Sequence, residues 1–443
     1  MTVITRFAPS PTGHIHIGNV RTALLCYLVA KSNSGQFMLR LDDTDKERSK
    51  TEYADQIKKD LQWLGLNWDL TAKQSDRFDR YNQIKQKLID DGRLYPCYET
   101  EEELDVMRKM LLGRGLPPIY DRGALKLSDE QKKQYESEGR SAHWRFKLDD
   151  SKPIEWNDLV KGPQKFDPAN LSDPILIRQN GLYTYMLPSA IDDMDFNISH
   201  VVRGEDHVSN TAIQIQLFEA IGDHMPIFAH HSLMKSKDGK ISKREGGFDV
   251  GSLKESGIEP MAITSLMARL GTSDPVEPRS SIEEIIENFD LSKFSRAAAI
   301  YDVSELERVN AKIVHMLEYD QIKSRDSMSG IDENFWNSVK YNIGNINEIQ
   351  AWKEICLDEL SPIVAKENED FLKEAADLLP QGEWNVETWS KWIEKIKEKT
   401  GRKGKDLFMP LRLALTAQEH GPELKNILPL IGRQKTLQRL GAS

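Results

Sequence analysis

The chain has 443 residues, of which 39% are hydrophobic and 29% charged, and its net charge is -10. At about 150 residues per domain this length predicts roughly three domains, and the hydrophobic fraction excludes a disordered chain. The charge excludes a wholly basic, non-specific nucleic-acid binder but leaves a local basic face open. The three cysteines, Cys26, Cys97 and Cys356, are too few for a disulfide scaffold or an all-cysteine zinc site.

The first elements predict a parallel sheet. Residues 3–7 form a short apolar strand candidate that runs into a Pro/Gly turn. Residues 17–31 have the three-to-four spacing of a helix, with Gly35 as its expected C-terminal cap, and 37–41 is a second strand candidate. Strand, helix and strand in about 40 residues indicate a βαβ unit with a right-handed crossover.

An insertion is predicted next. Helices are expected near 50–64 and 78–90. Between about 95 and 170, a charged helix at 101–110 and a strand candidate at 143–148 stand among Pro/Gly turns. We interpret this stretch as an insertion into the α/β domain.

Beyond the insertion the parallel pattern is predicted to return. Two strand candidates within 175–186 flank an Asn-Gly turn at 180–181. After Gly247 almost all of the chain is expected to be helical. The elements expected between these segments are a strand at 198–203, a helix at 210–221 and a strand at 227–230.

The net charge of the predicted helical region changes from negative to positive along the chain. Residues 301–390 carry 8 Lys+Arg against 19 Asp+Glu, whereas residues 391–443 carry 12 against 5. A basic, helical end on an acidic chain suggests contact with a polyanion, although a solvated charged face explains the same composition. No apolar run reaches the roughly 18 residues of a membrane span, and the N-terminus has no pattern of a secretion signal, so we expect a cytoplasmic protein.

The turn after the first strand, Thr12–Asn19, is the first candidate site. In open α/β sheets ligands bind at the carboxyl ends of strands beside helix N-termini, whose amides attract phosphate. His16 can donate to a phosphate oxygen, and Gly18 lets a flat ring approach the backbone. Taken alone, histidines such as His14 and His16 are more often surface loop residues than ligands.

The second candidate site is the pentapeptide KISKR at 240–244, flanked by glycines. Three cations in five residues suit a mobile clamp on a polyphosphate. Lysine supplies compact charge where negative charge develops on leaving pyrophosphate. An ordinary basic surface turn is the alternative if the pentapeptide is taken alone.

Together the two motifs resemble a known family. PSPTGHIHIGN resembles the HIGH motif, and KISKR the KMSKS motif, of class I aminoacyl-tRNA synthetases. More closely, the chain is similar to bacterial glutamyl-tRNA synthetases in matching order from residue 3 to about residue 440. The segments that carry this similarity are ITRFAPSPTGHIHIGNVRTAL, LRLDDTDKERS, YTYMLPSAIDD, HVVRGEDHVSNT, KISKREG, TGRKGKDLFMPLRLALT and HGPEL.

The resemblance implies a two-step reaction. Glutamate attacks the α-phosphate of ATP, accompanied by Mg²⁺, to give glutamyl-adenylate and pyrophosphate. The 2′-hydroxyl of the terminal adenosine of tRNA then takes the glutamyl group, without a covalent enzyme intermediate. Activation of glutamate in this family usually requires bound tRNA. Catalysis would rest on positioning and electrostatics.

The resemblance also implies residue roles. Arg6 would pair with the α-carboxylate of glutamate, Asp42 with its α-ammonium and Arg203 with its γ-carboxylate. Such pairs agree with the physics, because a buried carboxylate needs a cation and arginine offers a bidentate fork; a structural ion pair is the alternative for each. Further glutamate contacts are implied for Ser10, Tyr185 and Ser189. ATP contacts are implied for Pro11, Gly13, His16, Gly18, Asn19, Glu205, Lys240 and Lys243, with His16, Asn19, Lys240 and Lys243 as the catalytic residues.

Two departures from the family pattern bear on the pocket. The segment IEDTD of the family is here Leu41–Asp45, so that the shorter Asp42 has to reach further or through water. Ser189 stands where many members carry Asn. The zinc that some members hold needs a CxC pair with later Tyr and Cys; here Cys97-Tyr98-Glu99 keeps one cysteine, and we expect no zinc.

The implied fold class is α/β: a Rossmann-like parallel-sheet catalytic domain with an α+β insertion, followed by an all-helical C-terminal anticodon-binding region. Five tryptophans in that region, Trp336, Trp352, Trp384, Trp389 and Trp392, are expected to pack between helices rather than to stack on bases. The implied domains are the first half of the catalytic domain at 1–80, an acceptor-stem-binding insertion at 81–174, the second half with the KISKR loop at 175–250, a helical stem-contact region at 251–309 and the anticodon-binding region at 310–443.

The sequence leaves several different functions open. A glutaminyl-tRNA synthetase would carry β-rich C-terminal barrels, and a truncated paralogue that modifies a tRNA base would lack the C-terminal region. A catalytically silent tRNA-binding paralogue would share the fold, and a small-molecule nucleotidyltransferase would share the chemistry of the two motifs. The implied partners are tRNA-Glu, L-glutamate and ATP. The protein is expected to be a monomer without membrane contact. Whether it also charges tRNA-Gln stays open.

Overall fold

The computed structural model describes residues 2–222, 224–237 and 249–442. The chain forms two compact units. Unit 1 comprises Met1–Ser252, Thr264–Glu277 and Ser281–Asp302, and unit 2 comprises Leu253–Ile263, Pro278–Ser280 and Val303–Ser443. Within the described residues no helix combines the length and the apolar character needed to cross a membrane.

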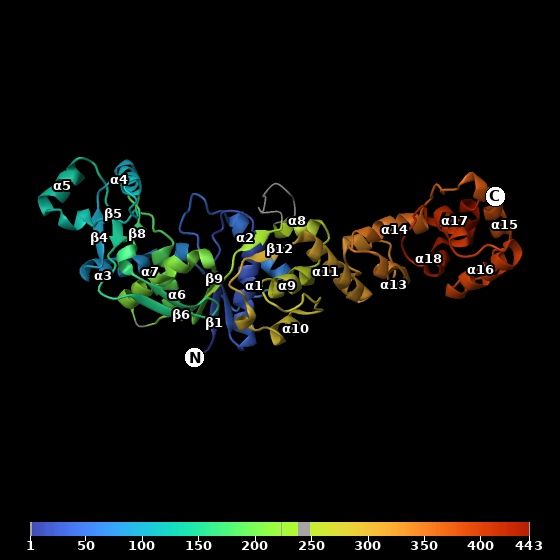
Figure 1. The fold of residues 1–443 in the computed structure, drawn as a ribbon, viewed down its shortest axis with the longest axis horizontal. Helices are drawn as coiled ribbons and strands as arrows, with labels where there is room; N and C mark the ends of the chain where they lie inside the picture. The colour runs from blue at the N-terminus through green and yellow to red at the C-terminus, as the bar shows by residue number, and fades with distance from the viewer. Residues whose placement is uncertain (1, 223, 238–248, 443) are drawn as a thin grey trace. The chain divides into compact units, whose positions relative to one another are not determined.

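A five-stranded parallel sheet forms the centre of unit 1 (Figure 1). Its order, β10-β9-β1-β2-β3, places β1 between two strands that lie far apart in the sequence. The chain therefore turns to opposite sides of β1, and such a reversal is where ligands bind in open α/β sheets. The strands are β1 (Ile4–Phe7), β2 (Gln36–Leu41), β3 (Leu70–Lys73), β9 (His200–Gly204) and β10 (Ile227–His231).

The predicted βαβ unit is confirmed. Helix α1 (Ile17–Ser32) connects β1 to β2, which pair in parallel from Ile4↔Gln36 to Phe7↔Leu39. The left-handed residue after α1 is Ser34, with φ 52°, and Gly35 closes the helix through its amide, which donates to the Ala30 carbonyl at 2.8 Å. Gly35 is also needed for close packing, since a Cβ there would lie 2.1 Å from the Val3 carbonyl oxygen.

Helices cover the sheet and share its apolar core. The predicted helices near 50–64, 78–90 and 210–221 are confirmed, whereas β3 and the helix α6 were not predicted. Buried residues of α3, α6 and α7 form one cluster with residues of the sheet and of the insertion. The bounds of these helices are Thr51–Trp63 for α2, Phe78–Asp90 for α3, Met186–Asp195 for α6 and Val208–Ile221 for α7.

The insertion is antiparallel. Strands β4 (Leu94–Cys97), β5 (His143–Phe146) and β8 (Ile175–Ile177) form one three-stranded sheet. The expectation that the parallel pattern returns at 175–186 is therefore wrong: β8 belongs to the insertion, and Tyr183 contributes only an isolated bridge. A separate hairpin and two helices complete the region, namely β6 (Ile154–Asp158), β7 (Gly162–Phe166), α4 (Glu101–Gly113) and α5 (Asp129–Ser137).

Beyond residue 248 the described chain is helical except for one short strand, β12 (Ala299–Tyr301), which pairs in parallel with β11 (Met234–Ser236). This agrees with the predicted helical C-terminal region. The helices up to residue 302 are α8 (Val250–Glu255), α9 (Pro260–Arg269) and α10 (Ile282–Glu287).

Unit 2 has its own core, which lies among the helices drawn from orange to red in Figure 1. Trp336, Trp352 and Trp392 are buried in this core, and Trp384 and Trp389 pack against it, so their predicted packing role is confirmed. The helices are α11 (Val303–Met316), α12 (Tyr319–Ile322), α13 (Glu333–Val339), α14 (Glu348–Leu357), α15 (Glu369–Asp377), α16 (Val386–Thr400), α17 (Lys405–Thr416), α18 (Leu424–Ile431) and α19 (Arg433–Arg439).

Candidate active site

A cavity of about 620 Å³ opens at the carboxyl ends of the central strands. Residues from the ends of β1 and β9, from the loop after β2 and from the start of α1 line it, as expected at a reversal of strand order. Nine of the predicted site residues are among its lining: Arg6, Ser10, His16, Gly18, Asn19, Asp42, Tyr185, Ser189 and Arg203.

The remaining predicted site residues do not line this cavity or are not described. Pro11 and Gly13 lie in the same turn but outside the lining. Glu205 forms an ion pair with Lys161, and its Oε1 accepts from the Leu233 amide at 3.1 Å, so its carboxylate is engaged in the protein. Lys240 and Lys243 lie outside the described residues.

His16 is the N-cap of α1. Its Nδ1 accepts from the amides of Gly18 at 3.1 Å and Asn19 at 3.4 Å, while Asn19 Oδ1 accepts from the His16 amide at 3.4 Å. This reciprocal capping box uses Nδ1 as an acceptor, so that the proton of the neutral imidazole resides on Nε2. The tautomer that donates from Nε2 is the one that a phosphate oxygen requires.

Gly18 is constrained by the same cap. A Cβ at this position would lie 2.9 Å from Cε1 and 3.0 Å from Nδ1 of His16. A larger residue would therefore displace the imidazole from the helix N-terminus. The structure adds this reason to the one predicted, which was the approach of a flat ring.

Arg40 binds two carboxylates beneath the cavity, and no role for this residue was predicted from the sequence. This side chain is only 1% exposed, and it donates from Nε to Asp42 at 2.7 Å and from Nη1 to Asp193 at 2.7 Å. Arg6 donates from Nε to the same Asp193 oxygen at 3.0 Å. Asp42 is therefore held by Arg40, and Ser189 Oγ lies 3.3 Å from its second oxygen. Burial raises the pKa of Asp42, and Arg40 opposes that rise.

Arg203 is a buried cation whose hydrogen bonds to the described residues all go to neutral groups. Its side chain lies at the end of β9, and the residue is 8% exposed. It donates from Nη2 to Thr211 at 2.6 Å and Gln214 at 2.7 Å, and from Nε to His230 at 3.2 Å. Within the described part of the chain no carboxylate forms an ion pair with it, and burial lowers the pKa of Arg203 to about 10. A buried cation at a cavity wall with no carboxylate in direct contact favours an anionic ligand.

Arg21 is a second such cation that was not predicted from the sequence. It is 1% exposed in the middle of α1 and lines the cavity. It donates to the carbonyls of Ser232 at 2.5 Å and Leu270 at 3.0 Å, and burial lowers the pKa of Arg21 to about 10. An arginine inside an otherwise apolar helix was the signal available in the sequence.

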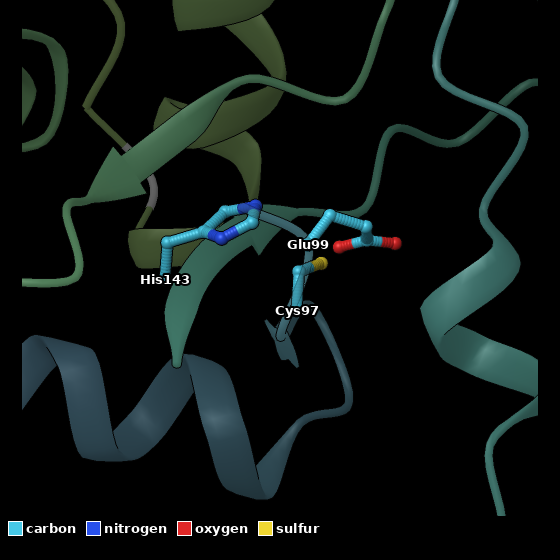
Figure 2. Close-up of side chains that lie close together, drawn as sticks. All are labelled: Cys97, Glu99 and His143. Carbon is cyan, nitrogen blue, oxygen red and sulfur yellow. The ribbon is translucent and has the colours of Figure 1, made fainter. Parts of the chain in front are cut away.

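Cys97, Glu99 and His143 converge in the insertion, as Figure 2 shows. Their donor atoms all lie within 4.8 Å of one another, because β4 pairs with β5 in the register Cys97↔His143. Glu99 Oε2 and His143 Nε2 are buried without a hydrogen-bond partner among the described residues. The prediction of no zinc rested on the cysteines alone, so it did not take Glu99 and His143 into account.

The cluster partly fits a zinc ion. A thiolate, a carboxylate and an imidazole are all zinc ligands, but structural zinc sites take four ligands. One oxygen of Glu99 already accepts from Tyr120 Oη at 2.6 Å. Burial raises the pKa of Cys97 to about 12, and burial together with Arg145 lowers the pKa of His143 to about 4.

Comparisons with known proteins agree with this architecture. The family described as tRNA synthetases class I (E and Q), catalytic domain, matches residues 2–308, and an anticodon binding domain matches residues 355–443. Glutamate–tRNA ligase 1 of Rickettsia rickettsii is 52% identical over 444 residues, which is 99% of each chain.

Two further relatives span the whole chain. Glutamate–tRNA ligase 1 of Wolbachia pipientis subsp. Culex pipiens is 48% identical over 441 residues, covering 100% of this chain and 98% of its own length. A crystal structure of a glutamate tRNA ligase from Elizabethkingia meningosepticum superimposes with a TM-score of 0.87 at 27% identity, covering 100% of this chain and 99% of that one. The chain therefore belongs to the class I tRNA synthetases for glutamate and glutamine and, within them, to the glutamate–tRNA ligases.

Proposed function

We propose that the chain activates L-glutamate with ATP and transfers it to the 3′-terminal adenosine of tRNA-Glu. The observation that carries the proposal is Arg203, a buried cation at the cavity wall that lacks a carboxylate partner among the described residues. The γ-carboxylate of glutamate would supply the missing anion. A neutral amide would leave the guanidinium poorly compensated.

The remaining glutamate contacts follow from the charges around Arg203. Arg6 uses Nε for Asp193, and no described residue accepts from its two terminal nitrogens, which suits a bidentate grip on the α-carboxylate. Asp42 carries the opposite charge and would meet the α-ammonium while Arg40 holds its carboxylate in place. Ser10, Tyr185 and Ser189 would complete this pocket.

ATP would bind at the N-terminus of α1. Nε2 of His16 would donate to a phosphate oxygen at the positive end of the helix dipole, while Nδ1 of His16 keeps the amides of Gly18 and Asn19 and Asn19 holds the cap. Mg²⁺ would arrive with ATP and neutralise part of the phosphate charge. Lys240 and Lys243 are proposed to bind the β- and γ-phosphates, with Pro11, Gly13, Gly18 and Glu205 around the nucleotide. No covalent enzyme intermediate is needed, because the adenylate itself is the activated species.

The proposal extends to the domains and the state of the whole protein. The five domains predicted from the sequence are kept, except that the insertion is extended to include β8 (Ile175–Ile177), with the tRNA acceptor stem on the insertion and the anticodon on the helical region. We infer a cytoplasmic monomer.

The experiment is steady-state glutamylation of purified tRNA-Glu and tRNA-Gln with ATP, Mg²⁺ and labelled glutamate. We expect tRNA-Glu to be charged. Charging of tRNA-Gln as well, or alone, would keep the reaction and change the tRNA specificity, which would require a later amidation in the same cell. Charging of neither tRNA by a folded protein would contradict the proposal and favour a silent tRNA-binding paralogue.

We also propose that the chain works without resident zinc. Its cluster has three donors instead of four, and Tyr120 engages one of them. Metal analysis of protein purified without chelator should therefore find much less than one zinc per chain. One zinc per chain that is lost in His143→Ala, with Cys356→Ala retaining it as the control, would contradict this expectation.

A further inference from the structure

A residue of the insertion reaches the catalytic sheet beneath the glutamate pocket. Asp158 ends strand β6, and both its side chain and that of His230 on β10 are fully buried. Asp158 Oδ2 lies 2.5 Å from Nδ1 of His230. The other oxygen, Oδ1, accepts from the backbone amides of Val160, Lys161 and His230 at 2.8 to 3.1 Å. The two oxygens therefore have separate tasks: Oδ1 holds the backbone and Oδ2 holds the imidazole.

The far side of the imidazole meets Arg203. Nε2 of His230 accepts at 3.2 Å from Nε of Arg203, which always carries a proton, and it lies 2.8 Å from Thr211 Oγ1, whose own hydroxyl donates to the His207 carbonyl. Nε2 must therefore be an acceptor, and the proton of the neutral ring must reside on Nδ1, where Asp158 accepts it. The chain of contacts from Asp158 to Arg203 is consistent with only one tautomer.

Asp158 and His230 differ in their protonation at neutral pH. Burial acts to raise the pKa of Asp158, but the hydrogen bonds from His230 and the backbone amides outweigh it and hold this pKa at about 2. Burial lowers the pKa of His230 and outweighs the hydrogen bond to Asp158, which acts to raise it, and the nearby Arg203 acts in the same direction as burial. At neutral pH an ionised carboxylate thus orients a neutral imidazole, and the imidazole orients the guanidinium without neutralising it.

We propose that Asp158, acting through His230, is a positioning residue for Arg203 and thereby sets the preference of the pocket for a carboxylate over an amide. The inference rests on the proposed function, because it deepens the role of Arg203 in glutamate binding. Thr211 and Gln214 hold Nη2, and the Asp158–His230 pair holds Nε, so that Nη1 is the nitrogen left for the ligand among the described contacts. A guanidinium held at three points presents Nη1 to the ligand in a fixed direction.

The test is Asp158→Asn. The amide oxygen can replace Oδ1 and keep the three backbone hydrogen bonds, while the amide nitrogen replaces Oδ2 and donates to Nδ1. The imidazole would then carry its proton on Nε2, where it can donate to Thr211 Oγ1 but can no longer accept from the Nε–H of Arg203. The substitution therefore reverses one hydrogen bond and leaves the size of the side chain unchanged.

The readout is ATP–pyrophosphate exchange in the presence of tRNA. We expect the KM for glutamate to rise roughly 10- to 100-fold, as is typical for loss of a hydrogen bond to a charged group, with the KM for ATP within about twofold of the wild type. The Asp158→Asn substitution should weaken the binding of L-glutamine, added as a competitor, less than it weakens the binding of glutamate. The matched control is Glu155→Gln, which removes a charge from the same strand where Glu155 pairs with the exposed Lys165 and should change neither constant.

The outcomes separate the two proposals. An Asp158→Asn enzyme that folds and keeps the wild-type KM for glutamate overturns the positioning role, as does an equal rise in the KM for ATP. A wild-type protein that activates no glutamate overturns the proposed function instead.

A second measurement covers the case in which Asp158→Asn does not fold. Nitrogen-15 spectra of the histidine-labelled wild-type protein report which ring nitrogen carries the proton, and His230→Gln identifies the signal. We expect the Nδ1–H tautomer at pH 7. A protonated Nε2 would overturn the inference.

Discussion

Arg40 lies at the centre of the charged cluster beneath the cavity, and its importance follows from its contacts alone. It bonds Asp42 and Asp193 and lies 3.7 Å from Asp192. Burial acts to lower the pKa of Arg40, but these carboxylates outweigh it and hold the pKa above its usual value. In the sequence Arg40 is one charged residue inside a strand, so only the folded contacts reveal that it holds the predicted ammonium-binding carboxylate.

Replacing Arg40 by lysine tests this role. The ammonium keeps the charge but loses the planar fork, so that Asp42 and Asp193 cannot both be held. We expect the free energy of unfolding to fall by about 2 kcal/mol because buried charged hydrogen bonds are lost. Urea denaturation measures this change. Arg48→Lys is the control, because Arg48 pairs with Asp45 at the surface. This substitution should change the free energy of unfolding by no more than about 0.5 kcal/mol. Equal effects in both variants would contradict the role of Arg40.

At the scale of elements, the helices and strands that could be predicted are those that are marked by residue spacing and turn residues close together in the sequence. The strand–helix–strand unit at the N-terminus and the helices after it followed from spacing and turn residues. The three-residue strand β8 was assigned to the wrong sheet, because alternation does not distinguish parallel from antiparallel pairing. Helix α6 was missed because the Asn-Gly turn before it suggested a hairpin whose second strand is a single bridge.

In the candidate site too, contacts within one local motif could be predicted, whereas contacts between distant segments were harder to predict. The residues in the motif that starts α1 could be predicted to lie together, since one turn and one helix N-terminus place them. Their convergence with Arg203 rests on β9 pairing beside β1, which the sequence offered only through the family resemblance. The pairing of Asp158 with His230 could not be predicted, because it joins an insertion strand to the catalytic sheet.

At the scale of the whole molecule, buried histidines contribute to the way stability depends on pH. Burial lowers the pKa of His231 to about 3 and that of His143 to about 4. In the unfolded chain both titrate near the ordinary value of about 6.5. Below that pH the unfolded state binds protons that the folded state does not bind. Stability is therefore fully present above pH 6.5 and falls as the pH decreases toward the folded pKa values.

Urea unfolding at pH 7, 6 and 5 measures this loss. Each histidine should contribute a slope of about 1.4 kcal/mol per pH unit below pH 6.5. His231→Gln should therefore lose stability less steeply than the wild type, whatever its stability at pH 7, because one proton-binding difference is gone. His14→Gln is the control, since His14 is exposed and should leave the slope unchanged. A His231→Gln protein with the wild-type slope would mean that His231 is not kept neutral by burial, and acid sensitivity would then have to come from the carboxylates at lower pH.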